Sequence, residues 1–276
     1  MKLITYRFSG KESVGILKET LVHPLPADSM LSLIESGSIP APCGDPIPLD
    51  QVELLSPIPR PRQDIICLGI NYKAHADEAA NYDTAFAKER PIPIYFSKRV
   101  CEAVPPDGMI QSHPGLVERL DYEVELAVII GKTAKNVPAE QAGDYIFGYT
   151  ILNDVSARVL QTAHKQWYFG KSLDGFTPIG PCIVTADEIA FPPVLPIRAR
   201  VNGELRQDST TDLLITGIAD IISQLSSGMT LLPGTIIATG TPSGVGMGFD
   251  PPKFLKTGDV VECEIEGIGI LRNTVD

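Results

Sequence analysis

The sequence predicts a strand-dominated α+β fold, a mixed or antiparallel β-sandwich or barrel with a few short helices. Short apolar runs with strand-like alternation recur between Gly and Pro turns from residue 64 onward. Segments with helical spacing are rare and do not alternate with the strands, which argues against a doubly wound parallel sheet. The 276 residues suit one large domain, or a main domain with a small additional one.

A small N-terminal domain is expected over residues 1–61. Its predicted elements are strand-like runs at residues 1–8 and 13–25 and a short helix at 29–37. The Pro-rich stretch 40–64 predicts extended chain, so we place the domain boundary within it, near Pro61.

The second predicted domain covers residues 62–276. Strands are predicted over residues 64–71, 93–98, 121–131, 144–154, 178–185, 196–205, 234–242, 259–267 and 269–275. Two helices are predicted, one over residues 71–89, which ends before Pro91, and one over 211–228, which Gly228 stops.

Composition and charge exclude several classes of protein. Hydrophobic residues make up 43% of the chain, enough for a sizeable core, and the formal net charge of −11 argues against nucleic acid as a partner. No stretch approaches the ~20 apolar residues of a membrane helix, and residues 1–10 lack the apolar region of a signal peptide. The five Cys form no Cys-x-x-Cys motif and mostly lie in apolar runs, which fits a reducing cytoplasm.

Carboxylates alternate with apolar residues in the stretch LDYEVELAVII at 120–130. Because residues i and i+2 of a strand share a face, Glu123 and Glu125 project together, some ~6–7 Å apart, and could converge on one cation. The alternative is the solvated face of a half-buried sheet. The stretch VECEIEG at 261–267 has the same alternation, so the pattern alone favours a solvated face for both.

A third carboxylate, Asp154, ends the apolar run 144–154 and precedes a helix-compatible segment. It could cap that helix, since Asp is a favoured N-cap residue. It could also complete an all-oxygen site with the two Glu residues, because no Cys or His pair lies near them. Mg²⁺ or Mn²⁺ would suit such a site, Ca²⁺ would fit less well, and zinc would prefer nitrogen or sulfur ligands.

The segment NYKAHADEAAN at 71–81 places His75 and Glu78 three residues apart. On a helix these side chains share a face, where a carboxylate that orients an imidazole makes a general base for water. The alternative is a surface helix on which the two residues merely coexist. The segment could also be a lid that orders over a site.

Two further stretches carry candidate binding groups. Lys171, in FGKSLDGFTPIGP, could bind a substrate carboxylate or stabilise an oxyanion, or it could be an exposed turn lysine. The small-residue loop TGTPSGVG at 239–246 could hold an anionic group through its amides and Thr241, or it could be a tight turn.

Taken in order, these motifs resemble the fumarylacetoacetate hydrolase family. The matching stretches lie between about residues 62 and 276 and read LGINYKAHADE, LDYEVELAVIIGK, GYTILNDVSARVLQ, GKSLDGFTPIGP, VNGELRQ, ATGTPSGVG and FLKTGDVVECEIEGIGILRNTV. Each stretch is weak alone, but seven in family order form a specific signal. The first sixty residues add little to the resemblance.

The resemblance implies roles for nine residues and a fold. The implied metal ligands are Glu123, Glu125 and Asp154; the acid–base pair is His75 and Glu78; the active-site lysine is Lys171; and the substrate contacts are Arg158, Gln161 and Thr241. The implied fold is the family's mixed β-sandwich roll, commonly a homodimer. Asp121 receives no role, and Glu262, Glu264 and Glu266 are left on a solvated face.

The function implied is a Mg²⁺- or Mn²⁺-dependent hydrolase that cleaves a C–C bond in a small 2-oxo acid of the acylpyruvate type through a metal-bound enolate. The alternative is an oxaloacetate-type decarboxylase or a 2-hydroxy-dienedioate isomerase using the same site, because one enolate supports all three outcomes. A non-enzymatic binding protein is the rival from another class. Degradation of aromatic compounds is a plausible setting.

Overall fold

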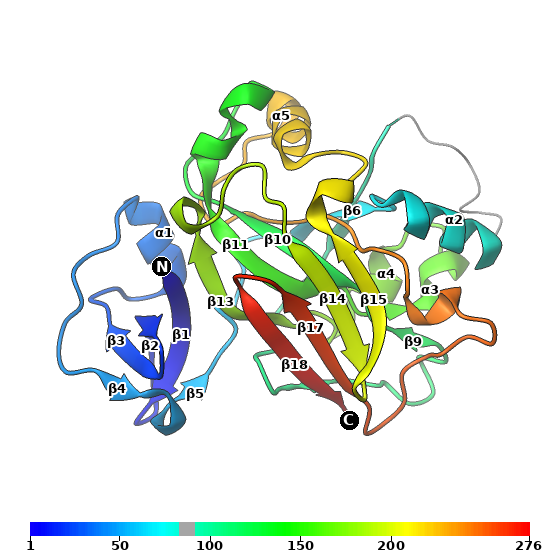
Figure 1. Cartoon of the computed structure of the whole chain (residues 1–276), viewed down its shortest axis with the longest axis horizontal. Helices are drawn as coiled ribbons and strands as arrows, with labels where there is room; N and C mark the ends of the chain where they lie inside the picture. Colours follow the sequence, from blue (N-terminus) through cyan, green and yellow to red (C-terminus); the bar gives the residue numbers. More distant parts are fainter. Residues whose placement is uncertain (83–91) are drawn as a thin grey trace.

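In a computed structural model, which describes residues 1–82 and 92–276, two β-sheets pack face to face and a few short helices cover their edges (Figure 1). Buried side chains from both sheets form one apolar cluster between them. The predicted strand-dominated α+β sandwich is therefore confirmed.

The larger sheet has eleven strands in the order β4-β3-β2-β1-β13-β11-β10-β16-β6-β7, with β5 paired to β1. Its strands are β1 (Lys2–Phe8), β2 (Lys11–Lys18), β3 (Leu21–Pro24), β4 (Ile47–Pro48), β5 (Glu53–Leu54), β6 (Ile65–Gly69), β7 (Ile94–Lys98), β10 (Val124–Ile130), β11 (Ile146–Asn153), β13 (Ile179–Thr185) and β16 (Ile236–Ala238). All of its pairings are antiparallel except that of β16 with β6.

The smaller sheet has five strands in the order β15-β14-β17-β18-β8, and β9 pairs separately with β12. These strands are β8 (Met109–Ile110), β14 (Pro196–Val201), β15 (Glu204–Thr210), β17 (Val260–Ile265), β18 (Gly269–Val275), β9 (Leu120–Asp121) and β12 (Ser156–Ala157). Along β17, Val261, Cys263 and Ile265 are buried. Glu262 and Glu264 are half-buried and Glu266 is exposed, which confirms the solvated face expected there.

The central strand β10 is buried on both of its faces. Val124, Leu126 and Val128 join the cluster between the sheets, and Ala127 and Ile129 join a second cluster on the opposite side. Helix α1 (Met30–Ser36) supplies side chains to that second cluster. The solvated-face alternative for residues 120–130 is therefore wrong, because a second layer covers each side of the strand. The predicted single strand 121–131 is also divided, since Tyr122 and Glu123 separate β9 from β10.

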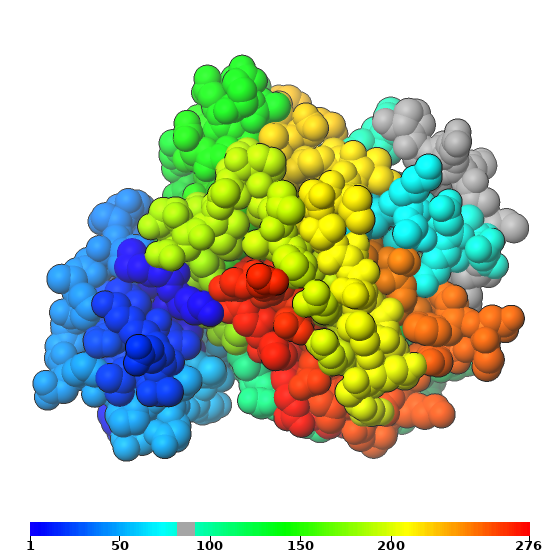
Figure 2. Space-filling view, in the orientation of Figure 1, coloured from blue at the N-terminus to red at the C-terminus, as the bar shows by residue number. Residues whose placement is uncertain are grey.

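The first five strands extend the larger sheet, because β1 pairs with β13 through Leu3 and Ile183. They form a block at one side of the molecule (Figure 2). The division near Pro61 stays a prediction.

Five α-helices lie within the described ranges: α1 (Met30–Ser36), α2 (Lys73–Tyr82), α3 (Arg158–Ala163), α4 (Tyr168–Lys171) and α5 (Ile218–Gly228). The helix predicted over 71–89 is present as α2, and its residues beyond 82 lie outside the described part. The helix predicted over 211–228 is shorter than expected, because Thr211–Leu213 forms a 3₁₀ turn and Gly217 is extended. The remaining 3₁₀ turns are Leu49–Gln51, Ala139–Tyr145, Ala186–Glu188 and Gly246–Gly248.

Candidate active site

The ends of two neighbouring strands bring two carboxylates together. β10 and β11 are antiparallel and pair Val124 with Asn153, so Glu123 and Asp154 both lie one residue beyond this pair. The backbone N–H of Asp154 donates to the carbonyl of Glu123 at 2.8 Å. The N–H of Glu123 donates to Oδ1 of Asn153 at 3.0 Å. The two carboxylates are thus fixed side by side by their own backbones.

Glu125 completes a carboxylate triad from the next inward-facing position of β10. Each of the three residues offers one carboxylate oxygen, and these oxygens lie within 4.8 Å of one another. All three residues are at most 5% exposed. The capping alternative for Asp154 is wrong, because α3 begins after Ala157 and has no side-chain cap.

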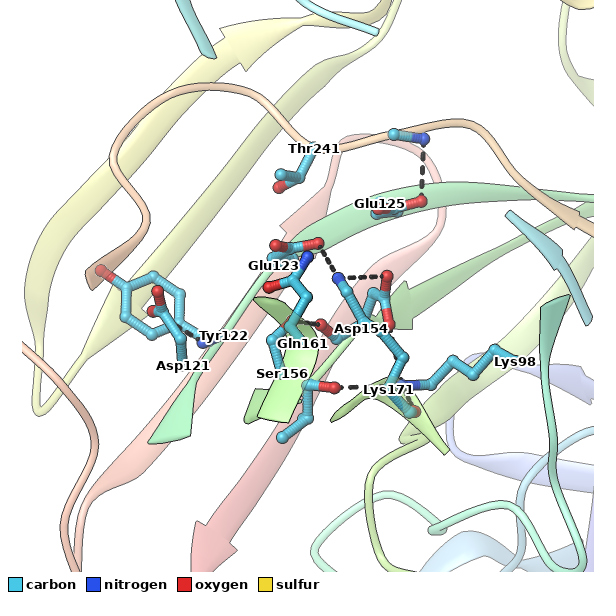
Figure 3. Close-up of polar contacts among 12 residues, drawn as sticks. Lys98, Asp121, Tyr122, Glu123, Glu125, Asp154, Ser156, Gln161, Lys171 and Thr241 are labelled. Carbon is cyan, nitrogen blue, oxygen red and sulfur yellow. Dashed lines mark hydrogen bonds and ion pairs between the residues drawn. The ribbon is translucent and has the colours of Figure 1, made fainter. Parts of the chain in front are cut away.

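Three buried cations surround the triad. Lys171 Nζ lies 2.7 Å from Glu123 Oε2 and 2.7 Å from Asp154 Oδ2 (Figure 3). Lys98 Nζ lies 2.8 Å from Asp154 Oδ1, and Arg158 Nη1 lies 2.7 Å from Glu123 Oε1. Lys171 is 2% exposed, so the exposed-turn alternative is wrong. Lys98 received no role from the sequence.

The cations are distributed unequally over the triad. Burial raises the pKa of Glu123, but the charges of Lys171 and Arg158 outweigh burial and lower this pKa to about 2. Burial, together with the charges of Asp154 and Glu123, raises the pKa of Glu125 well above its ordinary value. Glu125 accepts a hydrogen bond from the N–H of Gly240 at 2.8 Å, and none of the cation contacts above reaches it.

The donor set fits a hard divalent cation. All three candidate ligands are carboxylates, which suit Mg²⁺ or Mn²⁺. Among the described residues, Asp154 Oδ1 is a buried oxygen that receives no well-aligned hydrogen bond, although it forms an ion pair with Lys98. An oxygen of this kind keeps a lone pair for a metal.

The His75–Glu78 pair predicted on the helix is present. His75 Nδ1 lies 3.0 Å from Glu78 Oε2, and His75 is only 5% exposed, so the surface-helix alternative is wrong. Glu78 Oε1 accepts a hydrogen bond from the N–H of Gly244 at 2.9 Å. Because Glu78 engages Nδ1, the other ring nitrogen, Nε2, remains available to a substrate. A Cβ at Gly248 would lie 1.8 Å from Glu78 Oε1, so the loop can approach the helix this closely only with glycine there.

Asp121, which received no role from the sequence, is a buried anchor beside the triad. Its carboxylate accepts hydrogen bonds from Arg158 Nε at 2.9 Å and from the N–H groups of Gly246 and Met247 at 2.7 and 3.0 Å. Burial raises its pKa and the charge of Arg158 only partly opposes this. Asp121 therefore ties the loop after β16 to the arginine that contacts the triad.

The three predicted substrate contacts differ in their free hydrogen-bonding capacity. Arg158 Nη1 donates to Gln161 Oε1 at 3.1 Å, and Arg158 Nη2 is buried without a partner among the described residues. Thr241 Oγ1 donates to the carbonyl of Val124 at 2.9 Å and accepts from Gln207 Nε2 at 2.8 Å. The hydroxyl of Thr241 is thus engaged by the protein. Gln207 was missed as a site-supporting residue, since it lay inside a quoted motif without a chemical argument.

These groups meet in one narrow pocket with a cavity volume of about 20 Å³. The described residues that line it are Leu68, Gly69, Ile70, His75, Ala79, Phe96, Glu123, Glu125, Arg158, Gln161, Trp167, Lys171, Thr241 and Met247. The sequence also leads us to expect that residues 81–91 help to set the substrate tail, and only the first two of these residues lie within the described part.

A buried carboxylate triad beside a His–Glu pair and a lysine is typical of a metal-assisted enzyme that acts on a small organic acid. The chain belongs to the fumarylacetoacetate hydrolase family. Residues 64–276 match the family model described as Fumarylacetoacetate (FAA) hydrolase C-terminal, so the resemblance read from the sequence is confirmed. In the described residues we find no helix long and apolar enough to span a membrane.

Two curated relatives are named for the same activity. The chain is 47% identical over 227 residues to oxaloacetate tautomerase YisK of Bacillus subtilis, covering 82% of this chain and 74% of that protein. It is 45% identical over 230 residues to the mitochondrial oxaloacetate tautomerase Fahd2a of Rattus norvegicus, covering 83% and 71%.

Two solved structures are similar along the whole chain. The fumarylacetoacetate hydrolase of Exiguobacterium antarcticum has a TM-score of 0.89 and 40% identity, covering 100% of this chain and 99% of that one. The 2-hydroxyhepta-2,4-diene-1,7-dioate isomerase of Mycobacterium marinum has a TM-score of 0.82 and 34% identity, covering 100% and 98%.

Proposed function

We propose that the protein is a divalent-metal-dependent isomerase of a small 2-oxo dicarboxylate, interconverting the keto and enol forms of oxaloacetate. One observation carries the proposal: His75, Glu123, Glu125 and Lys171 line the same narrow pocket, where Glu78 contacts His75 and Asp154 contacts Lys171. The names of the tautomerase relatives at 45–47% identity support the substrate.

The residues that would hold Mg²⁺ or Mn²⁺ are Glu123, Glu125 and Asp154. When bound, the ion supplies a Lewis acid that polarises the 2-oxo group and a template for the acid. Lys171 Nζ, which lies within 2.7 Å of two of these carboxylates, offers an ammonium beside the charge that develops on the substrate oxygen. The unpartnered Nη2 of Arg158 can donate to a substrate carboxylate.

His75 is the group that moves the proton. Its Nε2 takes a proton from C3 of the keto form, and Glu78 stabilises the imidazolium through Nδ1. Return of the proton to the oxygen of C2 gives the enol. One C–H bond breaks and one O–H bond forms, so no water, oxidant or second substrate is consumed.

The C–C hydrolase expected from the sequence stays a second candidate. The same His75–Glu78 pair could activate water, and the similar Exiguobacterium antarcticum structure is named as a fumarylacetoacetate hydrolase. Decarboxylation also stays a prediction, as do the homodimer and the cytoplasmic location.

The test is a product analysis on the Mg²⁺-loaded protein. With oxaloacetate, we expect faster loss of the enol absorbance and faster exchange of the C3 protons with deuterium, without matching release of pyruvate. His75→Ala should lower kcat by roughly 100-fold or more, as expected for loss of a general base. If oxaloacetate is unaffected while an acylpyruvate is cleaved, the protein is a hydrolase and the proposal is wrong.

A further inference from the structure

We propose that Trp167 sets the upper size limit of the substrate, so that the pocket accepts a four-carbon 2-oxo dicarboxylate and excludes acids with a longer tail. This inference rests on the proposed function, because it names the determinant of substrate size in the same site.

The pocket lining divides into a charged half and an apolar half. The charged half consists of Glu123, Glu125, Arg158 and Lys171. The apolar half contains Trp167, Phe96, Ile70, Ala79 and Met247, which come from five separate segments of the chain. Trp167, Ile70, Ala79 and Met247 also belong to one small apolar cluster. The charged half suits the oxygens of a 2-oxo acid, and the apolar half limits the length of the substrate tail that extends beyond those oxygens.

Trp167 is fixed in position on two sides. Its ring lies directly on Gly69, where an added Cβ would sit 2.1 Å from the indole Cζ3 atom. Its ring centroid lies 5.3 Å from that of Phe96, in an edge-on arrangement. No side chain larger than hydrogen fits at position 69 while the indole remains there. The indole therefore lies against the backbone of β6 and cannot move any closer to that strand.

The aromatic wall, which Trp167 and Phe96 form, is in contact with the active-site lysine. The ring of Phe96 lies 5.4 Å from Lys171 Nζ, within the range of a cation–π contact. The backbone N–H of Lys171 donates to the carbonyl of Trp167 at 3.1 Å, so the indole and the Lys171 ammonium belong to the same helical turn. The distance from the charged half to the indole is therefore set by α4 itself.

The cavity volume shows how little space the wall leaves. About 20 Å³ is room for roughly one water molecule, so a bound acid must push lining side chains aside, and an acid with a longer tail must push aside more of them. Among the described residues of the lining, Trp167 has the largest side chain, so its removal enlarges the pocket more than any other single truncation there. Trimming this residue should lengthen the pocket without touching the charged half.

The first experiment compares Trp167→Ala with Phe169→Ala. Phe169 lies on the same helix, is 42% exposed, packs on His164 and does not line the pocket, which makes it a matched aromatic control. We expect Trp167→Ala to raise kcat/KM for a six-carbon or longer acylpyruvate, relative to oxaloacetate, by about tenfold or more. Phe169→Ala should leave this ratio unchanged. A Trp167→Leu variant provides the same comparison where the Ala variant fails to fold.

The second experiment measures binding and does not depend on turnover. Calorimetry with Mg²⁺ should show wild type binding oxamate at least about tenfold more tightly than N-butyl oxamate, and Trp167→Ala should remove most of that difference. Because Trp167 is the sole tryptophan of the chain, its emission should also change saturably when oxamate is added to the wild-type protein with Mg²⁺.

The outcomes separate two failures. If wild type does not act on oxaloacetate but the oxamate preference depends on Trp167, the proposed function fails and the size limit stands. If the oxamate preference is the same in wild type, Trp167→Ala and Phe169→Ala, Trp167 does not set the size limit, whatever the reaction.

Discussion

Replacing Lys98 with Met should destabilise the metal-free protein far more than any exposed lysine does. Lys98 is fully buried and places Nζ 2.8 Å from Oδ1 of Asp154, which is equally buried. Its ammonium also donates to the backbone carbonyls of Val155, at 3.1 Å, and of Lys171. Met preserves the length and apolar stem of the side chain, so the substitution removes mainly the charge and three contacts.

The expected magnitude follows from those contacts. Breaking a buried ion pair from one side costs about 3–5 kcal/mol, because the partner charge stays buried. Asp154 keeps Lys171, which reduces the loss, but two buried carbonyls lose a donor at about 1–3 kcal/mol each. The remaining pair with Lys171 and the two carbonyl losses act in opposite directions, so we expect the total to stay at about 3–5 kcal/mol. For 276 residues the unfolding entropy is about 0.6 kcal/mol/K, so Tm should fall by about 5–9 °C.

The assay is thermal unfolding of wild type, Lys98→Met and Lys11→Met in the presence of a chelator. Lys11 is an exposed strand residue and should change Tm by less than about 1 °C. A Tm for Lys98→Met within 1 °C or so of that control would refute the reasoning, since it would mean that Asp154 does not depend on the buried ammonium.

Three further predictions concern the carboxylates. Binding of Mg²⁺ at mildly acidic pH should release a proton, because the pKa of Glu125 is raised by burial and by the charges of Asp154 and Glu123. Calorimetry in buffers of different ionisation enthalpy should detect this proton release in wild type and should not detect it in Glu125→Gln. Because the pKa of Glu125 is raised in the folded protein, protonated Glu125 stabilises the metal-free protein, fully so below the ordinary pKa of 4.5, and this stabilisation is lost as pH rises. The Tm of wild type minus that of Glu125→Gln should therefore fall between pH 4.5 and 8. A difference that rises with pH would contradict the assignment. Glu78→Gln should lower kcat for oxaloacetate about ten- to a hundredfold with little change in KM, because His75 loses the carboxylate that supports its charge; unchanged kcat would remove the pair from the mechanism.

The sequence predicts the fold through local patterns, whereas the three carboxylates of the triad are candidates that only the family resemblance singles out as metal ligands. Alternation identifies β10 and β11, and a carboxylate at a strand end needs no long-range information to be noticed. What the pattern could not supply is the environment of the strand. Glu125 and Glu264 both occupy polar positions of an alternating stretch, yet Glu125 is buried and Glu264 is not, because β10, unlike β17, has apolar layers on both sides.

The residues missed at the sequence level share a different property. Lys98, Gln207 and Trp167 act through partners between 34 and 98 residues away, or through backbone atoms, and no spacing rule connects them. Lys98 contacts Asp154 across 56 positions, and Trp167 covers Gly69 across 98. A basic or aromatic residue next to a strand or helix end carries no sequence signal that distinguishes a buried partner from an exposed turn.

The charge balance of the site explains why these missed cations matter for function. Four buried carboxylates, Asp121, Glu123, Glu125 and Asp154, lie beside three buried cations, Lys98, Arg158 and Lys171, so the side chains sum to one negative charge when all are ionised. Among the described residues Glu125 forms no ion pair with these cations, and its burial, together with the charges of Asp154 and Glu123, raises its pKa. With the carboxylate of Glu78 counted as well, a divalent ion brings the sum from two negative charges to zero, so it removes the repulsion that the side chains alone would exert on a dicarboxylate dianion. A triad without these cations would keep a net negative charge even with the ion bound, so Lys98, Arg158 and Lys171 are what make a carboxylate site suitable for an acidic substrate.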